Sequence, residues 1–136
     1  MNCLFVKAPF ADWIVDGVKL IEYRTRETLI RGRIGIIESG TGTVIGDVEL
    51  VSSVYNSTQN IYNWLLSRPR RYAKPIVFEH KRGYVTWALL DIDPEQQKLA
   101  PRLPPARFKR ESAAYRETIN NWLLEHTQRL AQHVED

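Results

Sequence analysis

The feature that most constrains the fold is a series of short apolar runs that are rich in β-branched residues. Glycine, proline and charged residues separate these runs from one another. Runs of this length and composition predict strands, and the chain contains five or six of them. The expected strands cover residues 2–7, 20–25, 33–39, 44–55, 74–80 and 83–92. Because short helical patterns interrupt the strands, the sequence predicts an α+β fold: a small, strongly curved sheet or β-barrel that carries helices.

A first helix is expected directly after the first strand. Pro9 suits the first turn of a helix, where its missing N–H is not needed, and Phe10 and Trp13 follow at helical spacing. Gly17 lies where the residue just past a helix usually adopts a left-handed conformation. The chain is therefore expected to turn at Gly17 and to enter the strand over residues 20–25. Gly46 is expected to mark a bulge in the strand over residues 44–55.

Two further helices are expected later in the chain. Ser57 or Thr58 can cap a short helix that Pro69 would end. The prolines after residue 93 indicate an extended, basic connector over residues 94–110, and residues 111–136 then predict an amphipathic helix. Its apolar stripe consists of Tyr115, Ile119, Trp122, Leu123 and Leu130. This stripe is expected to pack on the main domain, residues 1–93, or on a partner, which includes a second copy of the chain.

Composition limits the class of protein. A chain of 136 residues with 43% hydrophobic residues is long enough for one domain with one core. Cys3 is the only cysteine, so an internal disulfide is excluded and a reducing compartment, the cytoplasm, is expected. The sequence shows neither a signal-peptide pattern nor an apolar run long enough to span a membrane. A net charge of +3 does not by itself indicate nucleic acid.

A glycine-containing turn and the three histidines could suggest a phosphate-binding loop and a metal site, but neither has the required residue pattern. The turn over residues 39–43 contains two glycines but lacks the Gly-Lys-Ser/Thr ending of a phosphate-binding loop, so a hairpin turn is expected. The histidines His80, His126 and His133 have no ligand spacing and no cysteine partner. Neither a metal nor a cofactor is therefore expected.

The segment from Gly17 to Arg24 carries the strongest site signal. Along a strand, alternate residues share a face, so Glu22 and Arg24 point the same way, and Lys19 precedes them in the turn. Two cations and a carboxylate can then converge on a polar ligand: arginine on a phosphate or carbonyl, lysine as a charge or an amine, and glutamate as an acceptor or base. The alternative is an exposed Glu22–Arg24 pair that contributes little.

Two basic clusters, each around one aromatic residue, are expected in or beside loops. Guanidinium groups and rings together can contact phosphates and stack bases, although solvated loops have the same composition. The first cluster is Arg68, Arg70, Arg71 and Lys74 around Tyr72, and the second is Arg102, Arg107, Lys109 and Arg110 around Phe108.

Residues 8–25 and 31–39 resemble the ASCH domain of the PUA-like superfamily. The family pattern Gly-x-Lys-x-x-Glu-x-Arg is matched by Gly17, Lys19, Glu22 and Arg24, and the later Arg-Gly and small polar positions by Arg31, Gly32 and Ser39. Residues 83–87 look like a late strand of such domains. The resemblance implies a PUA-like β-barrel with a cleft for RNA or a nucleotide, lined by Lys19, Glu22 and Arg24, with Ser39 nearby.

Three functions remain open at this point. The first is binding of RNA or a nucleotide, with Arg70, Arg71 and Tyr72 extending the contact surface. The second is a small hydrolase that uses Lys19 and Glu22, because some relatives deacetylate N4-acetylcytidine; those relatives carry Thr where this chain has Glu22, and a carboxylate beside Lys19 would raise its pKa. The third is an interaction protein that acts through the final helix.

Overall fold

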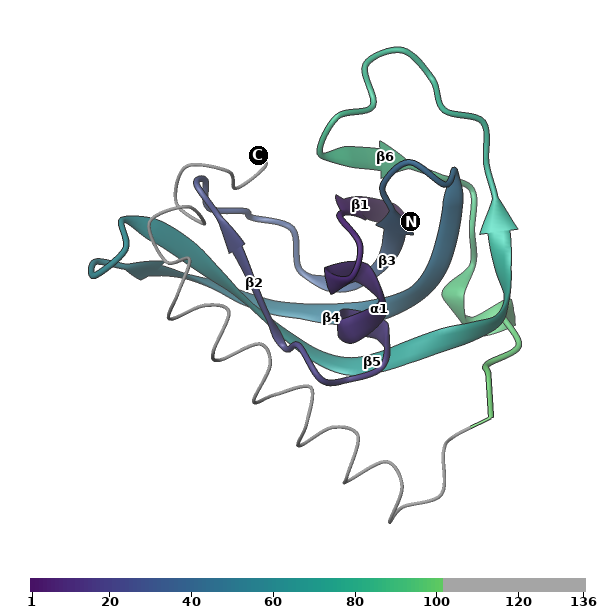
Figure 1. Ribbon diagram of the computed structural model, residues 1–136, viewed down its shortest axis with the longest axis horizontal. Coiled ribbons are helices and arrows are strands. Elements are labelled where there is room, and N and C mark those ends of the chain that lie inside the picture. The colour runs from purple at the N-terminus through teal and green to yellow at the C-terminus, as the bar shows by residue number, and fades with distance from the viewer. Residues whose placement is uncertain (102–136) are drawn as a thin grey trace.

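The computed structural model describes residues 1–101 and consists mainly of strands. The expected connector beyond residue 101, the second basic cluster and the final helix lie outside the described residues. The elements, in chain order, are β1 (Asn2–Val6), α1 (Phe10–Val15), β2 (Ile21–Arg24), β3 (Gly32–Glu38), β4 (Thr43–Asn56), β5 (Ile61–Val77), β6 (Trp87–Leu89) and the 3₁₀ helix η1 (Pro94–Gln96) (Figure 1). Among residues 1–101, no helix has the length and apolar character needed to cross a membrane.

The strands form one strongly curved sheet in the order β2-β5-β4-β3-β1-β6 (Figure 1). In the described residues the sheet is open, because no ladder joins the edge strands β2 and β6. Side chains nevertheless bridge the opening: the Trp64 ring of β5 stacks on Trp87 of β6 with centroids 5.9 Å apart, and Arg24 of β2 donates to the Phe5 carbonyl of β1. The expected strongly curved sheet is thus present with six strands, and it does not close into a barrel within the described residues.

Both faces of the sheet carry a hydrophobic cluster, as the alternation along β1 illustrates. Leu4 and Val6 belong to the cluster on the inner face, where α1 lies, and Cys3 and Phe5 belong to the other. The inner cluster adds Ala11, Ile14, Val15, Ile34, Ile36, Ile45, Val48, Leu50, Trp64 and Leu66. Burial on both faces agrees with the apolar run from Cys3 to Val6 in β1 and with Ile34, Ile36 and Ile37 in β3, and parallel pairs such as β1 and β3 are usually buried in this way.

The turn that leads from α1 into β2 agrees with the sequence prediction. Pro9 is the residue before the first helical turn, and the Ala11 and Trp13 N–H groups donate to the carbonyls of Lys7 and Pro9. Gly17 follows α1 with φ of +82°, the left-handed conformation that was expected. This turn places residue 19 at the entrance of β2.

The short helix expected after Ser57 is wrong, because residues 57–60 form the turn of a hairpin and β5 begins at Ile61. Pro69 was expected to end that helix, but it lies inside β5. The register between β5 and β4 shifts there, opposite Asp47 and Glu49 of β4. Arg68 there has φ of +49°. A bulge tolerates a residue without an N–H, which is why the strand continues. The bulge expected at Gly46 is confirmed by the register shift between Val44 and Gly46.

The hairpin expected between residues 74–80 and 83–92 is also wrong. Residues up to Val77 belong to β5, and β6 pairs with β1, Asn2 opposite Leu89. The connector then returns to β5 as far as it is described. The Ala73 N–H donates to the Lys98 carbonyl at 2.8 Å, and the Ala100 N–H donates to the Arg71 carbonyl at 2.9 Å.

Candidate functional site

Lys19, Glu22 and Arg24 gather on the inner face of the sheet at the edge strand β2. The register pairs Glu22 with Trp64 and Arg24 with Tyr62 of β5, so both charged side chains point to the same face as the buried Trp64. All three are buried: 6% of Lys19, 7% of Glu22 and 3% of Arg24 is exposed. The shared face expected from the sequence is therefore correct, and the alternative of an exposed Glu22–Arg24 pair is excluded.

Glu22 holds the two cations together. Its Oε1 accepts from Lys19 Nζ at 2.8 Å and from the Tyr23 N–H at 3.2 Å, and its Oε2 accepts from Arg24 Nη2 at 3.0 Å. The same Arg24 nitrogen donates to the Phe5 carbonyl at 2.8 Å. Lys19 also donates to the Ile21 carbonyl. Lys19, Glu22 and Arg24 thus form one connected, buried network.

Aromatic rings surround both cations of this network. Lys19 Nζ lies 5.8 Å from the ring centroid of Phe10 and 5.5 Å from that of Tyr23, and Arg24 Cζ lies 5.7 Å from the Trp64 ring. Cation–π contacts of this kind compensate in part for the lost hydration of a buried cation. The walls of the site are therefore apolar and flat, while its polar atoms belong to Lys19, Glu22 and Arg24.

Burial and the neighbouring charges shift the pKa values of the network in opposite senses. Burial alone would raise the pKa of Glu22, but Lys19 and Arg24 together lower it to about 2, so this carboxylate stays ionised at neutral pH. For Lys19 burial is the larger effect: it lowers the pKa even though Glu22 acts to raise it. Glu22 thus acts to raise the pKa of Lys19, as expected, but burial outweighs it and the net direction is downward.

Ser39 lies beside the same end of β1 as the Arg24 contact. Its N–H donates to the Val6 carbonyl at 2.9 Å, one residue beyond the Phe5 carbonyl that accepts from Arg24. Ser39 is half-buried and follows the end of β3. The two contacts thus lie on consecutive residues of β1, and the described residues show no hydrogen bond between the Ser39 side chain and Lys19, Glu22 or Arg24.

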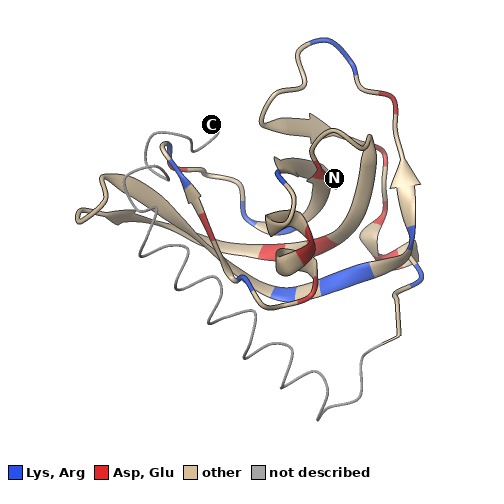
Figure 2. Ribbon diagram, in the orientation of Figure 1, with Lys and Arg blue, Asp and Glu red and all other residues tan. Residues whose placement is uncertain are grey.

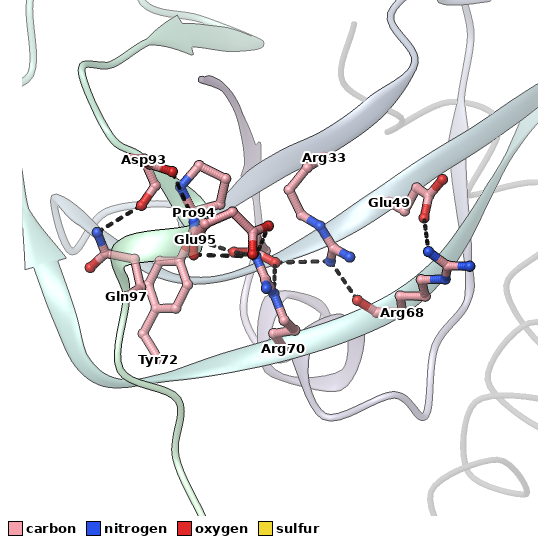
Figure 3. A network of polar contacts seen from close by, with 10 residues as sticks. Arg33, Glu49, Arg68, Arg70, Tyr72, Asp93, Pro94, Glu95 and Gln97 are labelled. Atoms are coloured by element: carbon pink, nitrogen blue, oxygen red, sulfur yellow. Dashed lines mark hydrogen bonds and ion pairs between the residues drawn. The ribbon is translucent and has the colours of Figure 1, made fainter.

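Arg70 and Tyr72 belong to a different network, centred on Asp47 of β4 (Figure 3). Asp47 is completely buried; it accepts from Arg70 Nε at 2.7 Å and Nη2 at 3.0 Å, from Arg33 Nη1 at 2.9 Å and from the Tyr72 hydroxyl at 2.6 Å. Burial and the bond to Asp47 raise the pKa of Tyr72, so its hydroxyl stays a donor. Arg70 also contacts Glu95 at 3.5 Å, which ties η1 to the sheet.

Arg71 points to α1 instead. Its guanidinium donates to both carboxylate oxygens of Asp16, at 2.7 and 3.0 Å, and to Asp12 at 2.7 Å. Figure 2 shows the basic part of β5 beside the acidic residues around α1. The first basic cluster was expected in or beside a loop, but all its members lie in β5, where carboxylates pair with Arg70 and Arg71, and Tyr72 is 3% exposed.

Sequence reasoning missed Asp47 and the tryptophan pair Trp64 and Trp87. Asp47 is the only charged residue between Thr43 and Val48 of an otherwise apolar strand, and a lone carboxylate in such a run requires buried cations. Within residues 1–101, no group of three or more His, Cys, Asp and Glu side chains is placed to hold a metal ion.

Comparisons with known proteins show which family the chain resembles. The family model of the ASCH domain matches residues 4–132 of the chain. Among solved structures the chain is similar to ASCH from Zymomonas mobilis, with 19% identity and a TM-score of 0.49 over 87% of this chain and 94% of that chain. A mutant of that protein gives 20% identity and a TM-score of 0.49 over 82% and 96% of the two chains. None of the curated proteins matches the chain.

Proposed function

Because the chain belongs to the ASCH domain family, we propose that it binds RNA or a nucleotide on the inner face of the sheet, through Lys19, Glu22 and Arg24. The observation that carries this proposal is the buried network itself, in which Glu22 holds two cationic donors side by side on the inner face of the sheet. A phosphate or carbonyl oxygen of a ligand would accept hydrogen bonds from these donors.

The donors of the network suit such a ligand. A lysine ammonium has three N–H donors, and among residues 1–101 Lys19 uses two of them, on Glu22 and on the Ile21 carbonyl. Glu22 fixes the position of both cations, so it is a positioning residue in this proposal, whereas Lys19 and Arg24 contact phosphate or a base carbonyl. The flat rings of Phe10 and Tyr23 would flank a base.

The proposal also includes the remaining predicted ligand contacts, for which the structure gives weaker support. Ser39 would extend the contact from the adjacent end of β3. Arg70, Arg71 and Tyr72 are already paired with carboxylates, so a phosphate would have to compete with Asp47, Asp12 and Asp16 for them. A cytoplasmic location, expected from the lone Cys3, belongs to the same proposal.

Fluorescence anisotropy with a labelled single-stranded RNA hexamer of mixed sequence tests the site. Lys19→Met keeps the shape of the side chain and removes its charge, and Arg82→Ala, in an exposed loop, is the matched control for a lost cation. Loss of a hydrogen bond to a charged group predicts about tenfold weaker binding or more for Lys19→Met. In Lys19→Met, the slope of log affinity against log salt concentration should become shallower by about 0.7 per lost phosphate contact. Arg82→Ala should keep most of the affinity.

Circular dichroism establishes that Lys19→Met is folded, since the substitution is buried. An independent measurement on the wild-type protein is tryptophan fluorescence, because Trp64 lies against Arg24 and should respond to a ligand there. Unchanged RNA affinity and salt slope in folded Lys19→Met, with no fluorescence change in the wild type on adding RNA, would refute the site.

A hydrolase is the second candidate, and the pKa of Lys19 is the observation that favours it. Burial lowers this pKa, which increases the fraction of neutral amine available as nucleophile or base. Glu22, with its pKa lowered to about 2, is a weak base and would only orient Lys19. Incubation with N4-acetylcytidine and with labelled RNA, followed by chromatography for cytidine and cleavage products, tests this candidate. Turnover that Lys19→Arg abolishes while RNA binding persists would establish it; no turnover would eliminate it.

A further inference from the structure

The hairpin of β4 and β5 carries a row of side chains that begins at the buried network and ends in solvent. Directly opposite residues of an antiparallel pair share a face. Arg24 of β2 lies opposite Tyr62 of β5, and Tyr62 lies opposite Tyr55 of β4. Arg24, Tyr62 and Tyr55 therefore form one row across three strands, next to the row that contains Glu22 and Trp64.

The two tyrosines of this row are exposed to different degrees and are held in place. Tyr62 is half-buried against the inner cluster, whereas 52% of Tyr55 is exposed. Their ring centroids are 5.4 Å apart with an angle of 58° between the planes. The Tyr55 hydroxyl donates to Asn60 Oδ1 at 2.8 Å, across the hairpin turn. These contacts orient both rings in the absence of a ligand, while half of Tyr55 stays exposed.

The chain just beyond β2 lies beside the neighbouring row. The Arg26 backbone carbonyl accepts the indole N–H of Trp64 at 3.0 Å. Neighbouring aromatic residues on a sheet surface stack successive bases of a single strand, while basic residues beside them contact the phosphates. The tyrosine pair, with its exposed Tyr55 ring, and the face that it shares with Arg24 match that arrangement.

We propose that Tyr55 and Tyr62 form a second base-stacking subsite, so that the ligand is single-stranded RNA of two or more nucleotides rather than a free nucleotide. This inference rests on the proposed function, because the first nucleotide occupies the network of Lys19, Glu22 and Arg24. The next base along the RNA strand stacks on the exposed side of the Tyr55 and Tyr62 pair.

Anisotropy of a labelled RNA hexamer, with a nucleoside monophosphate and unlabelled hexamer as competitors, tests the subsite. Tyr55→Ala removes the exposed ring, and Tyr55→Phe keeps the ring but loses the bond to Asn60. Val54→Ala is the matched control, since Val54 is 48% exposed in the same hairpin and points to the opposite face. Tyr55→Ala should weaken hexamer binding by about 5- to 150-fold, the usual range for one stacked base. Tyr55→Phe and Val54→Ala should bind the hexamer as the wild type does.

The mononucleotide distinguishes this inference from the proposed function. Competition by the monophosphate should be equal in the wild type and in Tyr55→Ala, because it occupies only the first subsite. If hexamer binding depends on Lys19 but not on Tyr55, the second subsite is refuted and the proposed function stands. If Tyr55→Ala weakens the monophosphate as much as the hexamer, the subsite is also refuted, since the ring then acts on the first nucleotide. If the wild type binds neither ligand, both proposals fail.

Discussion

Replacing Glu22 by glutamine tests the energetics of the buried network directly. The substitution keeps the shape of the side chain and removes the single negative charge between Lys19 and Arg24. The pKa of Glu22 is lowered from 4.5 to about 2, and each pKa unit corresponds to about 1.36 kcal/mol, so ionised Glu22 stabilises the folded state by roughly 3 kcal/mol. A similar loss, about 3–5 kcal/mol, is usual when one partner of a buried ion pair is removed.

The sign of the pH dependence follows from the lowered pKa. The contribution of Glu22 is fully present above pH 4.5, where the carboxyl is ionised in both states, and it is lost as the pH falls towards 2. The difference in unfolding free energy between wild type and Glu22→Gln should therefore shrink from roughly 3 kcal/mol at pH 7 to roughly 1 kcal/mol at pH 3. Other carboxyl groups affect both proteins and cancel in the difference.

Urea unfolding of both proteins at pH 7, 5 and 3, followed by tryptophan fluorescence, measures this difference. Glu27→Gln is the control, since Glu27 is an exposed carboxylate in the loop after β2 and its substitution should change stability by less than about 0.5 kcal/mol at every pH. A Glu22→Gln protein as stable as the wild type at pH 7 would refute the reasoning. So would a deficit that is the same at pH 7 and pH 3, because packing rather than charge would then cause it.

Three further predictions concern other parts of the fold. Asp47→Asn should lower the unfolding free energy by about 3–5 kcal/mol in urea titrations, because two buried or half-buried guanidinium groups lose their counter-charge. Gly46→Ala should prevent folding as judged by circular dichroism, because a Cβ there would lie within 3 Å of the Arg70 carbonyl and the Val15 side chain. Gly40→Ala is the control: the space around Gly40 is open and its φ is +89°, so the substitution should lower the unfolding free energy by only about 1 kcal/mol. Burial raises the pKa of Cys3 to about 11, so a thiol reagent at pH 8 should react with it only in denaturant; rapid labelling of the folded protein would contradict this.

Local sequence signals predicted the elements whose conformation depends on near neighbours. The strand over residues 2–7 and the helix after Pro9 are present, and Gly17 adopts the expected positive φ. The shared face of Glu22 and Arg24 followed from the period of two along a strand. The motif around these residues also predicted the family, which the family model confirmed.

The errors arose where strand pairing outweighed local preference. Ser57 and Pro69 looked like the ends of a helix, but residues 61–77 pair with β4 along almost its whole length, and a bulge accommodates the proline. The partner of residues 87–89 is β1, at the other end of the sequence, rather than the neighbouring run. Short-range patterns do not contain the identity of a distant partner, so these pairings could not be predicted locally.

The sequence by itself determined that Lys19, Glu22 and Arg24 could meet, because their spacing across a turn and along a strand sets their directions. Only the tertiary structure decided that they meet out of water: the curvature of the sheet brings β2 towards β1 and β6, with Arg24 on the Phe5 carbonyl and Trp64 against Trp87. It also decided that Arg70 and Arg71 are paired with distant carboxylates. Burial and long-range ion pairs depend on which strands become neighbours, and the whole chain, not the local spacing, sets that.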